Sequence, residues 1–132
     1  MRQEEDFLGT LEIPNDALYG IHSERARVNF VNNTTFNFAW YKAIGKVKQA
    51  YFITYLQFTK AIEEKYGNNS PLKLLDQQLV SMLLETANEI SEGKYFEYFV
   101  VPAIQGGAGT SINMNINEIL TNVSLQKMGG NT

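Results

Sequence analysis

Apolar residues recur at three- and four-residue steps over most of this chain, a period that is typical of amphipathic helices. The longest such stretch predicts one helix over about residues 38–66, which ends at Gly67. Because apolar residues also lie on its other faces, this helix needs more than one packing partner. We interpret its main aromatic stripe as core or subunit packing and not as a cofactor site. That stripe consists of Trp40, Ile44, Val47, Tyr51, Tyr55, Phe58 and Ile62.

Several lysines interrupt the long helix, and their charges exclude a membrane span. Among them are Lys42, Lys46, Lys48 and Lys60.

Weak alternation over residues 2–14 predicts two short strands around a turn at Gly9 and Thr10. Asn15 or Asp16 then caps a helix that runs to about Asn29. Its apolar positions suit one buried side, and they are Ala17, Leu18, Ile21, Val28 and Phe30.

Beyond Gly67, Ser70 and Pro71 form a start signal for a third helix, with serine as the cap and proline in the first turn. This helix is expected over about residues 71–92, with Gly93 as its stop, followed by a short helical turn at 94–98. Its inward positions are expected to be Leu72, Leu75, Leu79, Met82, Leu83 and Ile90. The pattern as a whole predicts a mainly α domain over residues 1–132 with a short β-hairpin near the N-terminus.

An extended apolar segment at 99–102 leads into a glycine-rich loop, in which Gly106, Gly107 and Gly109 precede Thr110 and Ser111. The hydroxyl residues suit the cap of a fourth helix. Its apolar stripe is Ile112, Ile116, Ile119, Leu120 and Val123. A flexible loop at a helix start presents unpaired N–H groups and the positive end of the helix dipole, so the pattern favours an anion there.

Two polar rows follow this loop along the fourth helix. Asn113, Asn117 and Thr121 share one face, whereas the second row is Asn115, Glu118 and Asn122. Asparagine is a poor helix former, so these rows suggest contacts beyond folding. A glycine turn with a hydroxyl cap and a solvated asparagine face gives the same spacing, and spacing alone leaves both interpretations open.

Composition narrows the function classes. Eleven basic and fourteen acidic residues give a net charge of −3 without a basic patch, which argues against nucleic acid as a partner. The chain has no cysteine and one histidine, so disulfides, thiolate chemistry and a His or Cys metal site are not expected. The charged first residues lack the apolar segment of a signal peptide. We therefore expect a soluble cytoplasmic protein.

Two separated segments resemble the aspartase/fumarase superfamily, and together they cover nearly the whole chain. The stronger is Gly-Gly-Ala-Gly-Thr-Ser-Ile-Asn-Met-Asn-Ile-Asn-Glu-Ile at 106–119, extended through 122. The other lies at the beginning, in Arg2, Pro14 and residues 5–6, 8–9, 17–22, 25–26 and 29–30. Ala108 and Ser111 match the aspartate ammonia-lyase version of the signature, whereas the fumarase version usually has Ser and Gln there.

The resemblance implies elimination of ammonia from aspartate to give fumarate, without a metal or an organic cofactor. Removing a proton next to a carboxylate places extra negative charge on that carboxylate, which preorganised N–H and hydroxyl donors can stabilise. By resemblance, Thr110 is the first choice for binding the substrate, Gly109 and Ser111 shape the edge of the pocket, and Asn113 binds substrate or only holds the loop.

Structural roles are favoured for other polar residues. Arg25 is expected to pair with a nearby acid, and His22 to be structural. The pairs Glu63 with Glu64 and Glu89 with Glu92 are interpreted as solvated faces and not as catalytic acids.

Superfamily members are several times longer than this chain. Their catalytic serine in a mobile Gly-Ser-Ser loop and their substrate-binding Thr-His pair do not occur here, so no catalytic residue is assigned in this chain. Such enzymes are homotetramers whose active sites combine three subunits. The resemblance therefore implies an N-terminal domain, without the central helical bundle and C-terminal domain, that is inactive alone.

Three alternatives stay open. One is fumarase or another lyase of the superfamily. Another is an anion-binding module for phosphate or nucleotide, although no lysine follows Gly109 and Thr110 as the common nucleotide loop requires. The last is a helical interaction module.

Overall fold

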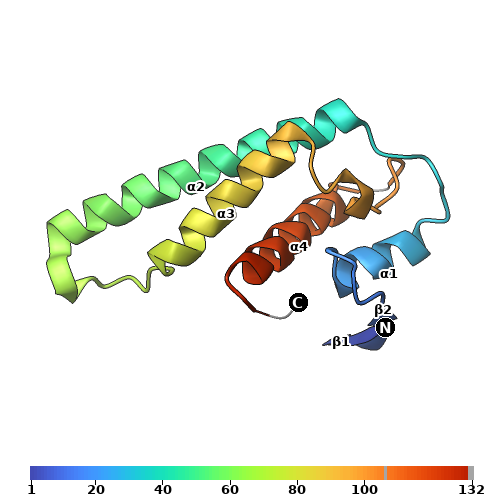
Figure 1. Cartoon of the computed structure of the whole chain (residues 1–132), viewed down its shortest axis with the longest axis horizontal. Coiled ribbons are helices and arrows are strands. Elements are labelled where there is room, and N and C mark those ends of the chain that lie inside the picture. The colour runs from blue at the N-terminus through green and yellow to red at the C-terminus, as the bar shows by residue number, and fades with distance from the viewer. Residues whose placement is uncertain (106, 131–132) are drawn as a thin grey trace.

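The N-terminal residues form the expected hairpin in the computed structural model, which describes residues 1–105 and 107–130 (Figure 1). Strands β1 (Arg2–Asp6) and β2 (Gly9–Ile13) pair antiparallel, with Arg2 opposite Ile13 and Asp6 opposite Gly9. The turn is Phe7-Leu8, two residues earlier than predicted. Asp6 Oδ1 accepts the Leu8 N–H at 2.9 Å, and Gly9 takes a φ of +106° where the chain re-enters the sheet. The glycine therefore ends the turn and does not lie within it.

Helix α1 (Ile21–Asn29) begins later than the predicted cap at Asn15 or Asp16. The guanidinium group of Arg2 donates to the carbonyl oxygens of Pro14 at 3.0 Å, Ala17 at 2.8 Å and Tyr19 at 2.9 Å. These bonds hold residues 14–19 in a non-helical path, so a tertiary contact overrides the local start signal.

The prediction for one apolar position of this first helix is also wrong. Val28 was expected on the buried side, but it is 59% exposed.

Helix α2 (Phe38–Tyr66) has the predicted bounds. The Asn37 side chain accepts the Trp40 N–H at 3.1 Å, and Gly67, with a φ of +55°, ends the helix. A 3₁₀ turn (Gly67–Asn69) follows.

The buried face of α2 differs from the predicted stripe. It carries Tyr41, Gly45, Phe52 and Thr59, whereas much of the aromatic stripe is exposed. Gly45 explains the choice, because a Cβ atom there would lie 2.5 Å from the Ser91 backbone nitrogen, so only this face allows close approach to the next long helix. The prediction of core packing is therefore wrong for four residues of the stripe, namely Trp40, Val47, Tyr51 and Phe58. Packing of the stripe against another subunit stays a prediction.

Helix α3 (Gln77–Glu92) begins six residues after the predicted start at Pro71. Asp76 caps it by accepting the Leu79 N–H at 3.0 Å. The predicted cap, Ser70, instead binds the Leu72 N–H at 3.1 Å in a local turn. Two leucines that were expected inward lie in this connection and are about half exposed, namely Leu72 and Leu75.

The end of α3 and the next turn agree with the prediction. Gly93 ends α3 in the left-handed conformation at a φ of +103°, and a 3₁₀ turn (Phe96–Tyr98) follows.

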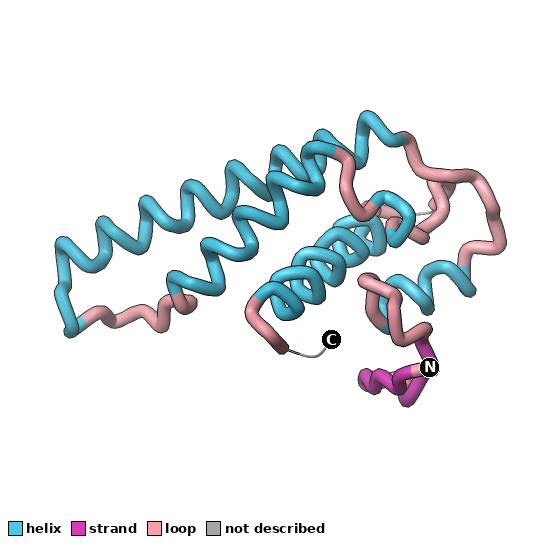
Figure 2. Tube along the Cα trace, in the orientation of Figure 1, coloured by secondary structure: helices cyan, strands magenta, loops and turns pink. Residues whose placement is uncertain are grey.

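Helices α2 and α3 run antiparallel as a long pair, and α4 (Thr110–Lys127) lies beside α3 and contacts α1 (Figures 1 and 2). The α4 stripe packs into the core as predicted, with Ile116, Ile119, Leu120 and Val123 buried and Ile112 half-buried. Aromatic rings also contribute to the core, since Phe99 packs edge-on against Phe36 at a ring separation of 4.9 Å. The core thus anchors α4, whose first residues are the candidate site.

None of the helices in the described ranges combines the length and the apolarity that a membrane crossing requires.

Candidate functional site

Helix α4 begins without a side-chain cap. Its N-cap is Gly109, in the left-handed conformation at a φ of +75°, and no side chain accepts a hydrogen bond there. The prediction that Thr110 or Ser111 caps the helix is therefore wrong, because both residues lie inside the first turn. A helix start leaves its first N–H groups without intrahelical partners, so an external acceptor can bind them.

The residues predicted for the site divide between two hollows. Gly109 and Asn113 line a cavity of about 470 Å³, whereas Ser111 lines a separate hollow of about 290 Å³ together with His22 and Arg25. Thr110 is exposed at the start of α4. The rest of the larger cavity is lined by Trp40, Ile44, Ala103, Gln105, Gly107, Ala108 and Ile112. Gly106, part of the predicted glycine loop, lies outside the described residues.

Lys48 on α2 contacts the candidate site. Its Nζ donates to Asn113 Oδ1 at 2.7 Å. Burial lowers the pKa of the Lys48 ammonium. The sequence analysis counted Lys48 only as a charge that interrupts the long helix, because nothing local to α2 shows that it reaches α4.

The second polar row of α4 serves folding. Asn115 is fully buried, and its Oδ1 accepts the N–H groups of Val100 at 2.9 Å and Val101 at 3.3 Å. Its Nδ2 donates to the Tyr98 carbonyl at 3.1 Å. Asn115 thereby fixes the extended segment that enters the glycine loop. The suggestion of contacts beyond folding is wrong for this residue.

Asn122 and Glu118 in the same row tie α4 to the N-terminal segment. Asn122 Nδ2 donates to the Leu18 carbonyl at 3.0 Å. The Glu118 carboxylate accepts the N–H groups of Gly20 at 3.1 Å, His22 at 2.9 Å and Ser23 at 3.1 Å, and it also accepts the Ser23 hydroxyl.

Glu118 therefore caps α1 from a position 98 residues away from Gly20. The N-cap residue Gly20 has no side chain that could accept these bonds, and the carboxylate also complements the positive end of the helix dipole. Sequence reasoning missed this role, and the one available signal was an acidic residue on a helix flank that otherwise carries amides.

Arg25 has the expected structural role. It donates two hydrogen bonds to the Asp6 carboxylate, at 2.9 and 2.8 Å, and a third to the Gly9 carbonyl at 2.7 Å. The hydrogen bond from Arg25 holds the pKa of Asp6 below its ordinary value of 3.8, against an opposing effect of burial. The pair fixes α1 to the hairpin.

Glu89 is not solvated, in contrast to the sequence interpretation. Its carboxylate accepts from Lys127 at 2.7 Å, Tyr95 at 2.8 Å and Lys94 at 3.2 Å. Burial alone would raise the pKa of Glu89, but these hydrogen bonds outweigh it and lower the pKa below 4.5. The group is an ion-pair cluster that joins α3 to α4.

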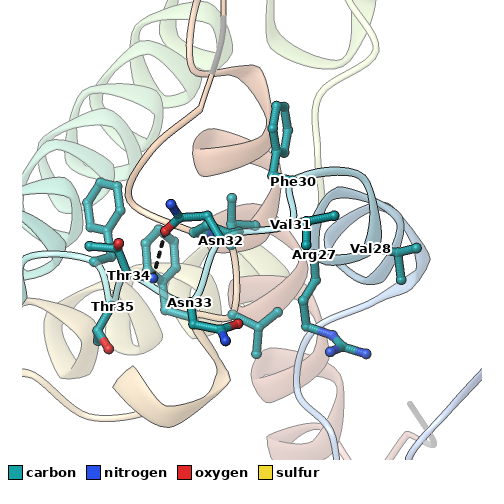
Figure 3. A pocket seen from close by; sticks show the side chains of 13 residues that line it. Arg27, Val28, Phe30, Val31, Asn32, Asn33, Thr34 and Thr35 are labelled. Atoms are coloured by element: carbon teal, nitrogen blue, oxygen red, sulfur yellow. Dashed lines mark hydrogen bonds between the residues drawn. The ribbon is translucent and has the colours of Figure 1, made fainter.

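Another hollow, of about 410 Å³, lies between the connection after α1 and the segment after α3 (Figure 3). Asn32 forms a local turn there, its Oδ1 accepting the Thr34 N–H at 2.7 Å. Arg27 brings the one charged side chain of the described lining, and it pairs with Glu24. The hollow contains none of the predicted site residues. Because the charge of Arg27 is already paired with Glu24, we assign no chemistry to this hollow.

Within the described ranges, no group of three or more histidine, aspartate or glutamate side chains is placed to hold a metal ion.

Solved structures show what class of protein has this fold. A fumarate lyase:delta crystallin from Brucella melitensis superposes with a TM-score of 0.82 and 31% identity, over 99% of this chain and 27% of that chain. A class II fumarase from Schistosoma mansoni has a TM-score of 0.76 at 22% identity, over 99% of this chain and 25% of that one, a likeness of fold alone.

Sequence comparison adds the family. The chain is 38% identical over 130 residues to an aspartate ammonia-lyase of Bacillus sp and 35% identical over 133 residues to that of Escherichia coli strain K12. Each alignment covers 98% of this chain and 25% of the relative. No protein-family model matches. The chain belongs to the aspartase/fumarase superfamily, and it spans about a quarter of the length of the curated relatives it matches.

Proposed function

We propose that this chain is the N-terminal domain of an aspartate ammonia-lyase, and that the start of α4 binds a carboxylate of the substrate. The observation that carries the proposal is the uncapped α4 N-terminus at Gly109, beside the exposed residue Thr110. Unpaired N–H groups, a nearby hydroxyl and the positive end of the helix dipole all favour a carboxylate. The similarity to named aspartate ammonia-lyases supports aspartate as the substrate.

The reaction breaks one C–H and one C–N bond and forms the C=C bond of fumarate. A base removes the proton from the carbon next to a carboxylate, and the electron pair then expels ammonia. Until ammonia leaves, the extra charge rests on that carboxylate, where fixed donors stabilise it more than they stabilise the substrate. The α4 start, with Thr110 and the backbone at Gly109, supplies part of this donor set. We assign no proton transfer to this chain.

Residues outside this chain complete the site in the proposal. The parent enzyme is a cytoplasmic homotetramer that acts on L-aspartate and fumarate without a cofactor, and the 132-residue chain alone is inactive. The exposed apolar stripe of α2 supports packing against further protein, because surfaces of this kind usually mark interfaces.

The test is an assay of fumarate absorbance with the intact enzyme that carries this domain and, in parallel, with the 132-residue chain. Aspartate is expected to give fumarate with the intact enzyme alone. Turnover of malate in place of aspartate by the intact enzyme would show a fumarase instead. Fumarate production by the isolated chain would contradict the assignment of essential groups to other segments.

A further inference from the structure

Lys48 and Asn113 form a contact between α2 and the first turn of α4 that the function proposed above leaves unused. The two residues are 65 positions apart, and Lys48 Nζ lies 2.7 Å from Asn113 Oδ1. Asn113 lines the 470 Å³ cavity together with Gly109. The contact therefore places a cation at the edge of this cavity.

The chemistry of the pair fixes the orientation of the amide. A lysine ammonium has only donors, so it selects the oxygen of the Asn113 side chain and turns the NH₂ group away from itself. Within the described part of the chain, that NH₂ group has no hydrogen-bond partner, whereas both ends of the Asn115 amide are occupied. Asn113 thus lines the cavity with NH₂ donors that have no other hydrogen-bond partner in the described part of the chain.

The charge of Lys48 also lacks a carboxylate partner in the described ranges, unlike those of Lys94 and Lys127, which pair with Glu89. Burial of Lys48 makes this ammonium less well solvated than a surface lysine. A partly desolvated cation near N–H donors that have no hydrogen-bond partner attracts an anion more strongly than it would in bulk water.

We propose that Lys48 is a positioning residue for the carboxylate site, which orients Asn113 as a donor and adds positive charge to the α4 N-terminus. This inference rests on the proposed function and extends it by naming the cation that serves the glycine-loop cavity. The ligand class is a small dicarboxylate. Lys48 acts through Asn113 and through its field and takes no part in proton transfer.

The first experiment uses the 132-residue chain and fumarate as the probe, followed by the backbone amide signals of residues 107–113 in NMR. Fumarate is expected to shift these signals. Lys48→Met is expected to weaken the affinity about tenfold, the effect of losing one nearby charge at intermediate dielectric. Lys48→Arg retains a donor-only cation and is expected to stay within about twofold of wild type.

Lys46→Met is the matched control, because it removes the same charge from an exposed position of the same helix. Its effect is expected to be small and abolished by salt. Equal weakening by both methionine variants would reduce Lys48 to part of the overall charge and overturn the inference. Absence of any fumarate-induced shift in the wild-type chain would overturn it as well.

The second readout is kinetic and uses the intact enzyme. Lys48→Met is expected to raise KM for aspartate more than it lowers kcat, and Lys48→Arg to restore KM. An unchanged KM with an intact fold contradicts the inference. If the intact enzyme does not act on aspartate at all, the proposed function fails, while the fumarate titration still decides whether Lys48 serves an anion site.

Discussion

Replacing Glu118 tests the long-range cap most sharply. Glu118→Ala removes the acceptor of three backbone N–H groups, at Gly20, His22 and Ser23, and of one hydroxyl. Gly20 has no side chain to replace it, and the Glu4 carboxylate, which accepts the Ile21 N–H at 2.8 Å, would remain as an acceptor at the α1 start.

The magnitude follows from counting these donors. A buried donor left unpaired costs about 1–3 kcal/mol. The hollow of about 190 Å³ beside Glu118 admits water, so the lower end of that range applies to each of the three N–H groups. Loss of the charge at the helix dipole adds about 0.5 kcal/mol. The expected destabilisation by Glu118→Ala is therefore about 3.5 kcal/mol in the free energy of unfolding. Glu118→Gln keeps one acceptor oxygen and is expected to cost about half as much.

The assay is urea unfolding of the 132-residue chain by far-UV circular dichroism, with amide hydrogen exchange as the site-specific readout. Exchange at His22 and Ser23 is expected to accelerate in Glu118→Ala. Glu64→Ala is the control, because Glu64 makes only an exposed 4.0 Å pair with Lys60 and is expected to contribute less than about 0.5 kcal/mol. If Glu118→Ala costs no more than this control and leaves exchange unchanged, the capping role is wrong.

Two further substitutions test contacts between the elements that support the candidate site. Gly45→Ala brings a Cβ to within 2.5 Å of the Ser91 nitrogen. The steric cost exceeds the gain in helix propensity, so urea unfolding is expected to show a net destabilisation of about 1–2 kcal/mol. A stabilised variant would show that α2 and α3 are not in close contact there. Because the Arg25 hydrogen bond lowers the pKa of Asp6, the ionised pair contributes stability that is complete above the ordinary pKa of 3.8 and is lost as the pH falls through the folded value. The stability advantage of wild type over Asp6→Asn is therefore expected to shrink below about pH 4, and an advantage independent of pH between 5 and 2.5 would refute the ion pair.

The sequence predicted most accurately what local chemistry decides. The bounds of α2 follow from its continuous apolar period and from Gly67, which adopts the positive φ that ends the helix. The end of α3 at Gly93 and the buried stripe of α4 follow from the same local rules. Residues close in sequence supply both the signal and the partner in these cases.

The errors arose where distant residues decide the outcome. Arg2 binds the carbonyl groups that the predicted start of α1 needed. The start of α3 is a local exception, because Asp76 and not Ser70 provides its cap. Gly45 selects the buried face of α2 by allowing backbone approach, although it adds nothing to an apolar pattern. Glu118 is the same kind of case, since its partners lie at the other end of the chain.

The sequence predicted the glycine loop and the helix after it, but not the contacts made around them. The glycine loop and the start of α4 were found from their residue types, and Gly109 and Asn113 do line one cavity. The expected hydroxyl cap does not form, because the N-cap is Gly109 and a hydroxyl one residue later is past the position from which it caps. Lys48 was missed because its contact with Asn113 depends on a long side chain that reaches from α2 to the first turn of α4.

The central claim is that the α4 start holds a substrate carboxylate, and the most direct measurement is fumarate formation from aspartate by the intact enzyme carrying Thr110→Val. Valine has the size of threonine without its hydroxyl, and Thr121→Val on the same helix is the matched control at another exposed position. We expect Thr110→Val to lower kcat/KM at least about a hundredfold, the effect of removing one donor to a developing charge, with unchanged assembly by size-exclusion chromatography. We expect the control to retain activity. Equal activity of Thr110→Val and wild type would contradict the claim.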